Sequence, residues 1–131
     1  MSVTWDKCTV NITNSTGSPM TYSSNSTSEG GIDTPGNIAA GGTGSFDGYS
    51  NWDDAANGCA GVVTFSLNDG TLFLVNYKTS YYYGGADDSK YSAGFQGALA
   101  NRYKATVSDS SSSSNGGAGK RVTVSVTAAK A

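Results

Sequence analysis

The chain has 131 residues, a length that favours one domain over residues 1–131 with room for a hydrophobic core. Only 14% of its residues are charged and 18 are glycines, so hydroxyl groups rather than charges keep it soluble. The net charge of −2 argues against nucleic acid as a partner, because phosphate binding needs clustered cations. Few segments have the apolar spacing of an amphipathic helix, so the composition predicts an all-β sandwich or barrel.

Short strands alternate with polar loops in the first part of the chain. Apolar and β-branched residues predict strands at 3–12, with a change of face near residue 6, and at 20–24 and 45–49. Polar and glycine-rich residues predict a turn at 14–19 and loops at 26–44 and 51–59. Trp52 in the last loop is either a lid over one end of the core or an exposed anchor, and the polar residues around it favour exposure.

A β-hairpin is predicted near the middle of the chain. Residues 62–67 and 72–77 are β-branched, aromatic and aliphatic, and the segment 68–70, Asn-Asp-Gly, tolerates the positive φ of a tight reversal. Alternation places Tyr77 on the same face as Phe73. Because that face is strongly apolar, the hairpin must pack against another layer.

Tyrosines are concentrated directly after the hairpin. Consecutive side chains of an extended chain point to alternate faces, so Tyr81, Tyr82 and Tyr83 cannot all enter one core. Either Tyr82 packs and its neighbours are ordinary strand residues, or exposed phenols, extended by Tyr91, form a cluster that suits a lipid interface or a sugar ring.

The last part of the chain holds two predicted strands around a flexible loop. Residues 92–99 are small and glycine-rich and fit a single helical turn. Strands are predicted at 101–107 and 120–128, and the serine- and glycine-rich segment 109–119 is predicted to be a flexible loop.

Catalytic chemistry has little support in the sequence. The chain has no histidine, which removes Ser-His and Cys-His nucleophile pairs and the commonest metal ligand. Two acidic pairs could contribute to a Ca²⁺ site, but without a third ligand at a recognised spacing they fit solvated loops better. The pairs are Asp53 with Asp54 and Asp87 with Asp88. The sequence therefore predicts a protein that is not an enzyme and needs no cofactor.

The N-terminal sequence predicts the compartment of synthesis. It has no basic segment followed by an apolar one, so no secretory signal is expected. The protein should therefore be made in the cytoplasm. It would reach membranes outside the cell only after release from the producing cell. Cys8 and Cys59 are either bridged or free, and a reducing compartment favours two buried thiols.

Several features follow one another in a characteristic order. They are a strand running into residues 11–17, Asn-Ile-Thr-Asn-Ser-Thr-Gly, then Gly44-Ser45-Phe46, then residues 58–65, the hairpin and the aromatic run. This order, over about residues 8–83, resembles the haemolysin β-sandwich group that contains aegerolysins and actinoporins. The resemblance implies an actinoporin-like, single-domain antiparallel β-sandwich that binds membrane lipids, often sphingolipids. For aegerolysins it also implies a larger partner protein that perforates the membrane.

The resemblance also implies a binding site. The residues at positions where the group carries headgroup-contacting aromatics are Trp52, Tyr77, Tyr81, Tyr82 and Tyr83. Residues 1–13 read as a strand rather than the inserting helix of actinoporins, so pore formation by this chain alone is not expected. The sequence thus predicts a cytolysin-like, lipid-binding protein. One alternative is a lectin in which the same aromatics stack on a sugar and the acidic pairs accept its hydroxyl hydrogens. The other is a storage or structural protein without a ligand.

Overall fold

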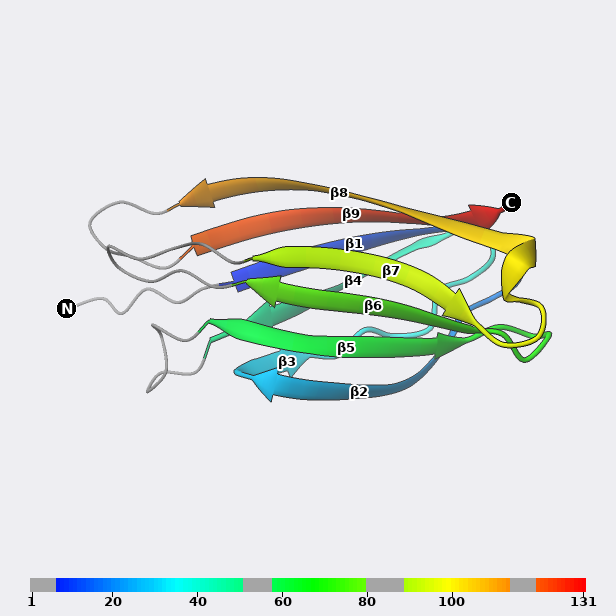
Figure 1. Cartoon of the computed structure of the whole chain (residues 1–131), viewed down its shortest axis with the longest axis horizontal. Helices are drawn as coiled ribbons and strands as arrows, with labels where there is room; N and C mark the ends of the chain where they lie inside the picture. Colours follow the sequence, from blue (N-terminus) through cyan, green and yellow to red (C-terminus); the bar gives the residue numbers. More distant parts are fainter. Residues whose placement is uncertain (1–6, 51–57, 80–88, 114–119) are drawn as a thin grey trace.

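The computed structural model describes residues 7–50, 58–79, 89–113 and 120–131, and they form two β-sheets packed face to face (Figure 1). In spatial order, the first sheet contains β3 (Gly31–Asp33), β4 (Thr43–Tyr49), β1 (Lys7–Ser15), β9 (Lys120–Lys130) and β8 (Tyr103–Ser113). The second contains β2 (Thr21–Glu29), β5 (Cys59–Ser66), β6 (Leu72–Thr79) and β7 (Lys90–Gln96). A 3-10 turn, η2 (Ala100–Arg102), precedes β8. The predicted all-β sandwich is confirmed.

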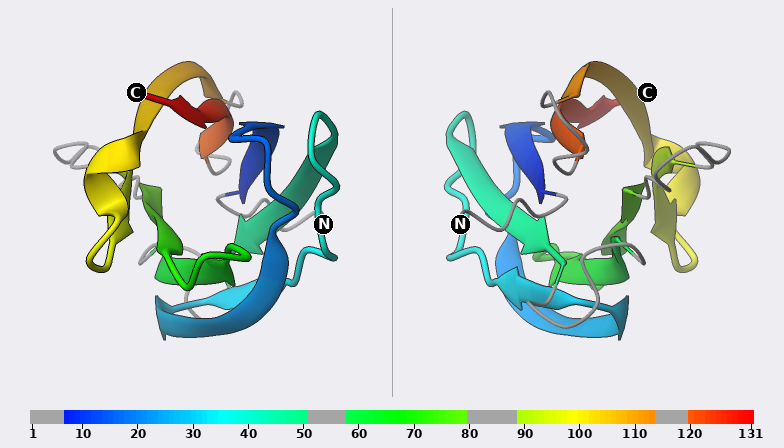
Figure 2. Two further views of the ribbon diagram at one scale, coloured as in Figure 1. Left: turned by 90° about the vertical axis from the view of Figure 1, so that its right-hand side faces the viewer. Right: turned by 90° about the vertical axis from the view of Figure 1, so that its left-hand side faces the viewer.

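The sheets enclose one core, as the view along the strands shows (Figure 2). Neighbouring strands are antiparallel except β1 and β9, which run parallel, so the first sheet is mixed and not purely antiparallel as expected. The exception is possible because β1 and β9 are the first and last strands, and no short turn between them dictates their relative direction.

The centre of the first sheet is a ladder of small apolar residues. β1 and β9 bury every second side chain, and their buried residues are paired in register. The pairs are Cys8 with Val122, Val10 with Val124 and Ile12 with Val126. Strict alternation therefore predicted the buried face of both strands correctly.

The predicted hairpin is β5 and β6, and it forms the centre of the second sheet. Its turn has Gly70 at φ +89°, and the backbone N–H of Thr71 donates to Oδ1 of Asp69 over 3.0 Å. Phe65 and Phe73 are fully buried on its inner face. The strongly apolar face thus packs against the first sheet, as the sequence requires.

A row of aromatic rings joins the two sheets at the side where β7 meets β8. Successive ring centroids are 6.1, 6.3, 4.9 and 5.0 Å apart. The rings belong to Tyr22, Phe65, Phe73, Phe95 and Tyr103. The row starts on β2, crosses the second sheet and ends on β8 of the first sheet, so it closes the core on that side.

Three predicted irregular segments were wrong in part. Residues 26–35 contain the end of β2 and all of β3, and residues 92–96 belong to β7 instead of a helical turn. β8 continues to Ser113 through the first part of the predicted loop at 109–119. In each case the cross-strand hydrogen bonds to a neighbour outweigh a polar, glycine-rich local sequence.

Cys8 and Cys59 are not bridged to each other and are fully buried, in agreement with the expected pair of thiols. Burial raises the pKa of Cys8 to about 12, although a hydrogen bond with the Thr79 side chain lowers it somewhat. Both cysteine side chains therefore belong to the hydrophobic core.

Candidate ligand-binding site

Several strands begin or end together at one end of the sandwich, on the left of Figure 1. Cys59 at the start of β5 pairs with Thr79 at the end of β6, and β7 starts beside them. β4 ends on the same side of the molecule. We call this the Thr79 end. The chain segments 51–57 and 80–88 follow β4 and β6, so both leave the described fold at this end.

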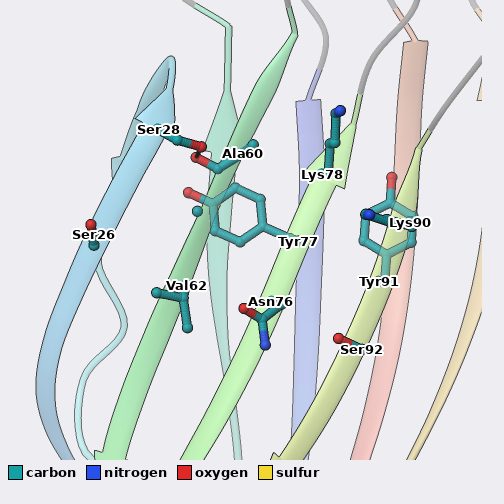
Figure 3. A pocket seen from close by; sticks show the side chains of 11 residues that line it. Ser26, Ser28, Ala60, Val62, Asn76, Tyr77, Lys78, Lys90, Tyr91 and Ser92 are labelled. Carbon is teal, nitrogen blue, oxygen red and sulfur yellow. Dashed lines mark hydrogen bonds between the residues drawn. The ribbon is translucent and has the colours of Figure 1, made fainter.

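A hollow of about 430 Å³ lies on the outer face of the second sheet, close to the Thr79 end (Figure 3). It crosses all four strands of that sheet. Its lining residues are Ser26 and Ser28 of β2, Ala60, Gly61 and Val62 of β5, Asn76, Tyr77 and Lys78 of β6, and Lys90, Tyr91 and Ser92 of β7.

Strand register explains which side chains face the hollow. Val62 pairs with Asn76, which pairs with Ser92, while Ala60 and Lys78 belong to the next row toward the Thr79 end. Residues of these two rows alternate with the core residues of the same strands, so their side chains point outward.

Small residues and a bent strand make this face concave. Ala60, whose side chain points outward from β5, puts little volume into the hollow. β2, at its edge, changes register with β5 twice, between Tyr22 and Ser24 and between Thr27 and Glu29. Such bulges bend the strand that carries them, and β2 is visibly curved in Figure 1.

The polar groups around the hollow are hydrogen-bond donors and cations. Lys78 and Lys90 are directly opposite each other on neighbouring strands, and Lys90 is exposed. Serine hydroxyls of β2 and β7 and the Asn76 amide face the same space (Figure 3). No carboxylate belongs to the described residues that line it. The hollow therefore offers positive charge and neutral donors to a ligand that accepts hydrogen bonds.

Tyr77 lies beneath the hollow and not on the surface, so its expected role as a surface aromatic was wrong. Only 2% of Tyr77 is exposed, and its ring packs against Phe46 of the first sheet with centroids 5.5 Å apart. Burial raises the pKa of its hydroxyl. That hydroxyl is buried and has no hydrogen-bond partner among the described residues.

Tyr77→Phe is therefore expected to leave the free energy of unfolding unchanged or to raise it by up to about 1 kcal/mol, because it removes a buried polar atom that forms no hydrogen bond. Tyr91→Phe is the matched control. Its hydroxyl shares a hydrogen bond with the Thr79 hydroxyl, so its loss should lower the same quantity by about 1 kcal/mol. Urea denaturation of both variants measures the difference, and equal losses would show that the Tyr77 hydroxyl has a partner.

The other predicted site residues divide into two groups. Tyr91 is half-buried and lines the hollow, and burial raises the pKa of its hydroxyl. The remaining predicted binding residues, Trp52, Tyr81, Tyr82 and Tyr83, lie outside the described residues, as do the acidic residues Asp53, Asp54, Asp87 and Asp88. Within the described ranges, no three His, Cys, Asp or Glu side chains are grouped as metal ligands would be.

The sequence interpretation missed the two lysines and the serines of the hollow. Alternation along β6 does place Asn76 and Lys78 together on its outer face. The pairing of Lys78 with Lys90 depends on β7, whose residues from 92 onward were expected to form a helical turn.

No model of a protein family matches the chain, and no curated protein matches its sequence. Solved structures do match its fold. The lipid-binding protein Nakanori has a TM-score of 0.69 at 15% identity, over 99% of this chain and 73% of Nakanori. The RahU protein, solved in complex with a TRIS molecule, has a TM-score of 0.64 at 12% identity, over 96% of both chains. At these identities the similarities show a shared β-sandwich fold and nothing finer.

Among the described residues, no helix has the length and apolar character needed to cross a membrane.

Proposed function

We propose that this protein is a non-enzymatic module that binds membrane lipids at the Thr79 end. The observation that carries the proposal is that two features lie at the same end of the molecule. β4 and β6, the strands that precede Trp52 and Tyr81 to Tyr83 in the chain, both finish at the Thr79 end, close to the donor-lined hollow. Aromatic rings beside polar and cationic groups suit the boundary between headgroups and acyl chains.

The similarity to Nakanori supports a lipid ligand, because that protein is a lipid-binding protein of the same fold. In the cytolysin-like version of this proposal, the module recognises headgroups, sphingolipids among them, and a larger partner protein would make the pore. Release from the producing cell would bring it to such membranes.

Tyr81→Ala combined with Tyr83→Ala tests the proposal. We expect the double variant to bind vesicles at least about tenfold more weakly, since two rings no longer enter the interface, while its thermal stability stays unchanged. Sedimentation with vesicles of phosphatidylcholine, with and without sphingomyelin, measures binding, and thermal unfolding by circular dichroism measures stability.

Two results would contradict the proposal. A fall in stability without a change in binding per folded molecule would assign the rings to the core. Wild-type protein that binds glycans on an array but no vesicle would instead support the lectin alternative.

A further inference from the structure

One row of residues across the second sheet brings polar and apolar side chains together at the hollow. Val62 of β5 pairs with Ser26 of β2 on one side and with Asn76 of β6 on the other. Asn76 in turn pairs with Ser92 of β7. All four residues line the hollow, and Figure 3 shows their side chains one after another across the four strands. A ligand in the hollow would therefore contact this row.

The polar side chains of the row are available to a ligand. Ser26, Asn76 and Ser92 are exposed, and their side chains form no hydrogen bond within the described part of the chain. A hydroxyl and a carboxamide each donate and accept hydrogen bonds, and the described lining contains no carboxylate. Such a set suits ligand hydroxyls, which also donate and accept, because an anion would use only its donors.

The apolar member of the row adds a second requirement. Val62 is half-buried between Ser26 and Asn76, whose strands are two spacings apart, about 9–10 Å. Together with Ala60, which points to the same face of β5, it gives the hollow an aliphatic floor. A sugar ring has a face of C–H groups and a rim of hydroxyls. A ring packed on Val62 can therefore reach Ser26 at one edge and Asn76 at the other.

The dimensions of the hollow set the number of rings. Its volume of about 430 Å³ is in the range of small-ligand sites. The row from Ser26 to Ser92 spans three strand spacings, about 14 Å, which is longer than one ring. A disaccharide fits this length, with its second ring over Ser92.

We propose that the hollow binds a neutral sugar of one or two rings. Val62 packs against the C–H face of the first ring, Ser26 and Asn76 exchange hydrogen bonds with its hydroxyls, and Ser92 bonds to the second ring. Each neutral bond contributes modestly because it replaces a bond to water, so binding depends on several of them together with the contact on Val62. The inference rests on the proposed function and deepens it: on a membrane, the sugar is the headgroup of a glycolipid.

The first experiment uses no membrane, so that it tests the sugar site alone. Methyl β-glucoside, methyl β-galactoside, lactose and cellobiose are each titrated into isotope-labelled protein, with glycerol as a polyol that has no ring. We expect at least one of the sugars to shift the side-chain N–H signals of Asn76 saturably in NMR spectra, and glycerol to leave them in place. The side-chain signals of Asn11, on the outer face of the first sheet, should not move with any of them.

Matched variants assign the shifts to the row. Asn11 is an exposed asparagine between Ser45 and Ser125, a polar row without an aliphatic neighbour. Asn76→Ala should weaken sugar binding at least about fivefold. Val62→Thr, which keeps the shape of the side chain but replaces a methyl group, should weaken it about threefold, whereas Asn11→Ala should bind as wild type does. The proposal would be overturned if no sugar moved the Asn76 signals of wild type, or if Asn76→Ala bound sugar as tightly as Asn11→Ala.

The second experiment asks whether the sugar belongs to a lipid. Phosphatidylcholine vesicles that contain ceramide are compared with vesicles that contain glucosylceramide, galactosylceramide or lactosylceramide at the same mole fraction. At least one glycosylceramide should strengthen the binding of wild type and of Asn11→Ala about fivefold over ceramide, and Asn76→Ala should lose this gain.

The two experiments separate the two proposals. Sugar binding in solution without vesicle binding would keep the sugar site, with a free glycan as its ligand, and remove the membrane function. Vesicle binding that depends on Tyr81 and Tyr83, with no response of Asn76 to any sugar, would keep the membrane function and overturn the sugar site. Equal binding to ceramide and glycosylceramide vesicles, by protein that binds sugar in solution, would overturn the glycolipid as the source of the sugar.

Discussion

Asn14→Asp is expected to destabilise the protein by about 3–5 kcal/mol at neutral pH, as an uncompensated buried charge does. Asn14 is fully buried at the end of the sandwich opposite the Thr79 end. Its side-chain Nδ2 group lies 2.8, 3.3 and 3.2 Å from the carbonyl oxygens of Ser18, Ile38 and Ala39. Its Oδ1 accepts from both the backbone N–H and the hydroxyl of Thr16.

The substitution reverses half of this arrangement while keeping its shape. The carboxylate oxygen that replaces Nδ2 would face three carbonyl oxygens and could donate nothing to them. Protonation restores one donor, so the pKa of the new carboxyl group is raised in the folded state above its ordinary value of about 3.9. The variant should therefore approach wild-type stability at acid pH and lose it as pH rises through the raised pKa.

Asn11→Asp is the matched control, because Asn11 is an exposed residue of the same strand. It should change stability by no more than about 0.5 kcal/mol. Urea denaturation of both variants across the acid to neutral range measures the effect. If the stability of the two variants depended on pH in the same way, the Asn14 amide would not be the hydrogen-bond donor that links the turn at 16–18 to residues 38 and 39.

Local alternation explains which parts of the fold could be predicted. In β1, β5, β6 and β9, apolar residues recur at every second position, and this pattern reports both the strand and its buried face. β2 has no such pattern, because as an edge strand it exposes almost all of its serine and threonine side chains. Its conformation comes from its hydrogen bonds to β5, which no local pattern contains.

The candidate site was harder to predict for the same reason. Its lining comes from four strands, and two of them, β2 and β7, are strands largely through pairing with their neighbours. The emphasis on tyrosines followed from their number, but burial depends on parity as well. Tyr77 has the parity of Phe73 and Val75 and is therefore buried with them. Asn76 and Lys78 have the opposite parity and face the hollow.

Gly48→Ala is expected to lower the free energy of unfolding by about 3 kcal/mol, and it is the substitution that should damage the floor of the hollow most directly. Gly48 is on the inner face of β4, opposite Cys8. A Cβ atom there would lie 2.6 Å from Cε2 of the Tyr77 ring and 3.2 Å from Cδ2 and Cζ. Such contacts are too short for the side chain to be accepted without movement of the ring.

The Tyr77 ring has little room to move away. On its other side, a Cβ atom at Gly61 would be 2.8 Å from the Tyr77 hydroxyl and 2.6 Å from the Ser26 carbonyl oxygen. The ring is thus held between two glycines of different sheets, and a methyl group at Gly48 must push either the ring into β5 or the sheets apart. Because β5 and β6 line the hollow, binding of a ligand there should fall together with stability.

Two further variants separate this cause from a general cost of replacing a strand glycine. Gly94→Ala on β7 has nothing within 4 Å of its added Cβ, and it should leave stability unchanged or raise it by up to about 1 kcal/mol. Tyr77→Phe should not rescue Gly48→Ala, since the short contacts involve ring carbons, whereas Tyr77→Leu should restore part of the loss. Additive losses in Gly48→Ala with Tyr77→Leu would show that the two residues do not interact, because a relieved clash makes the double variant lose less stability than the sum of the two single losses.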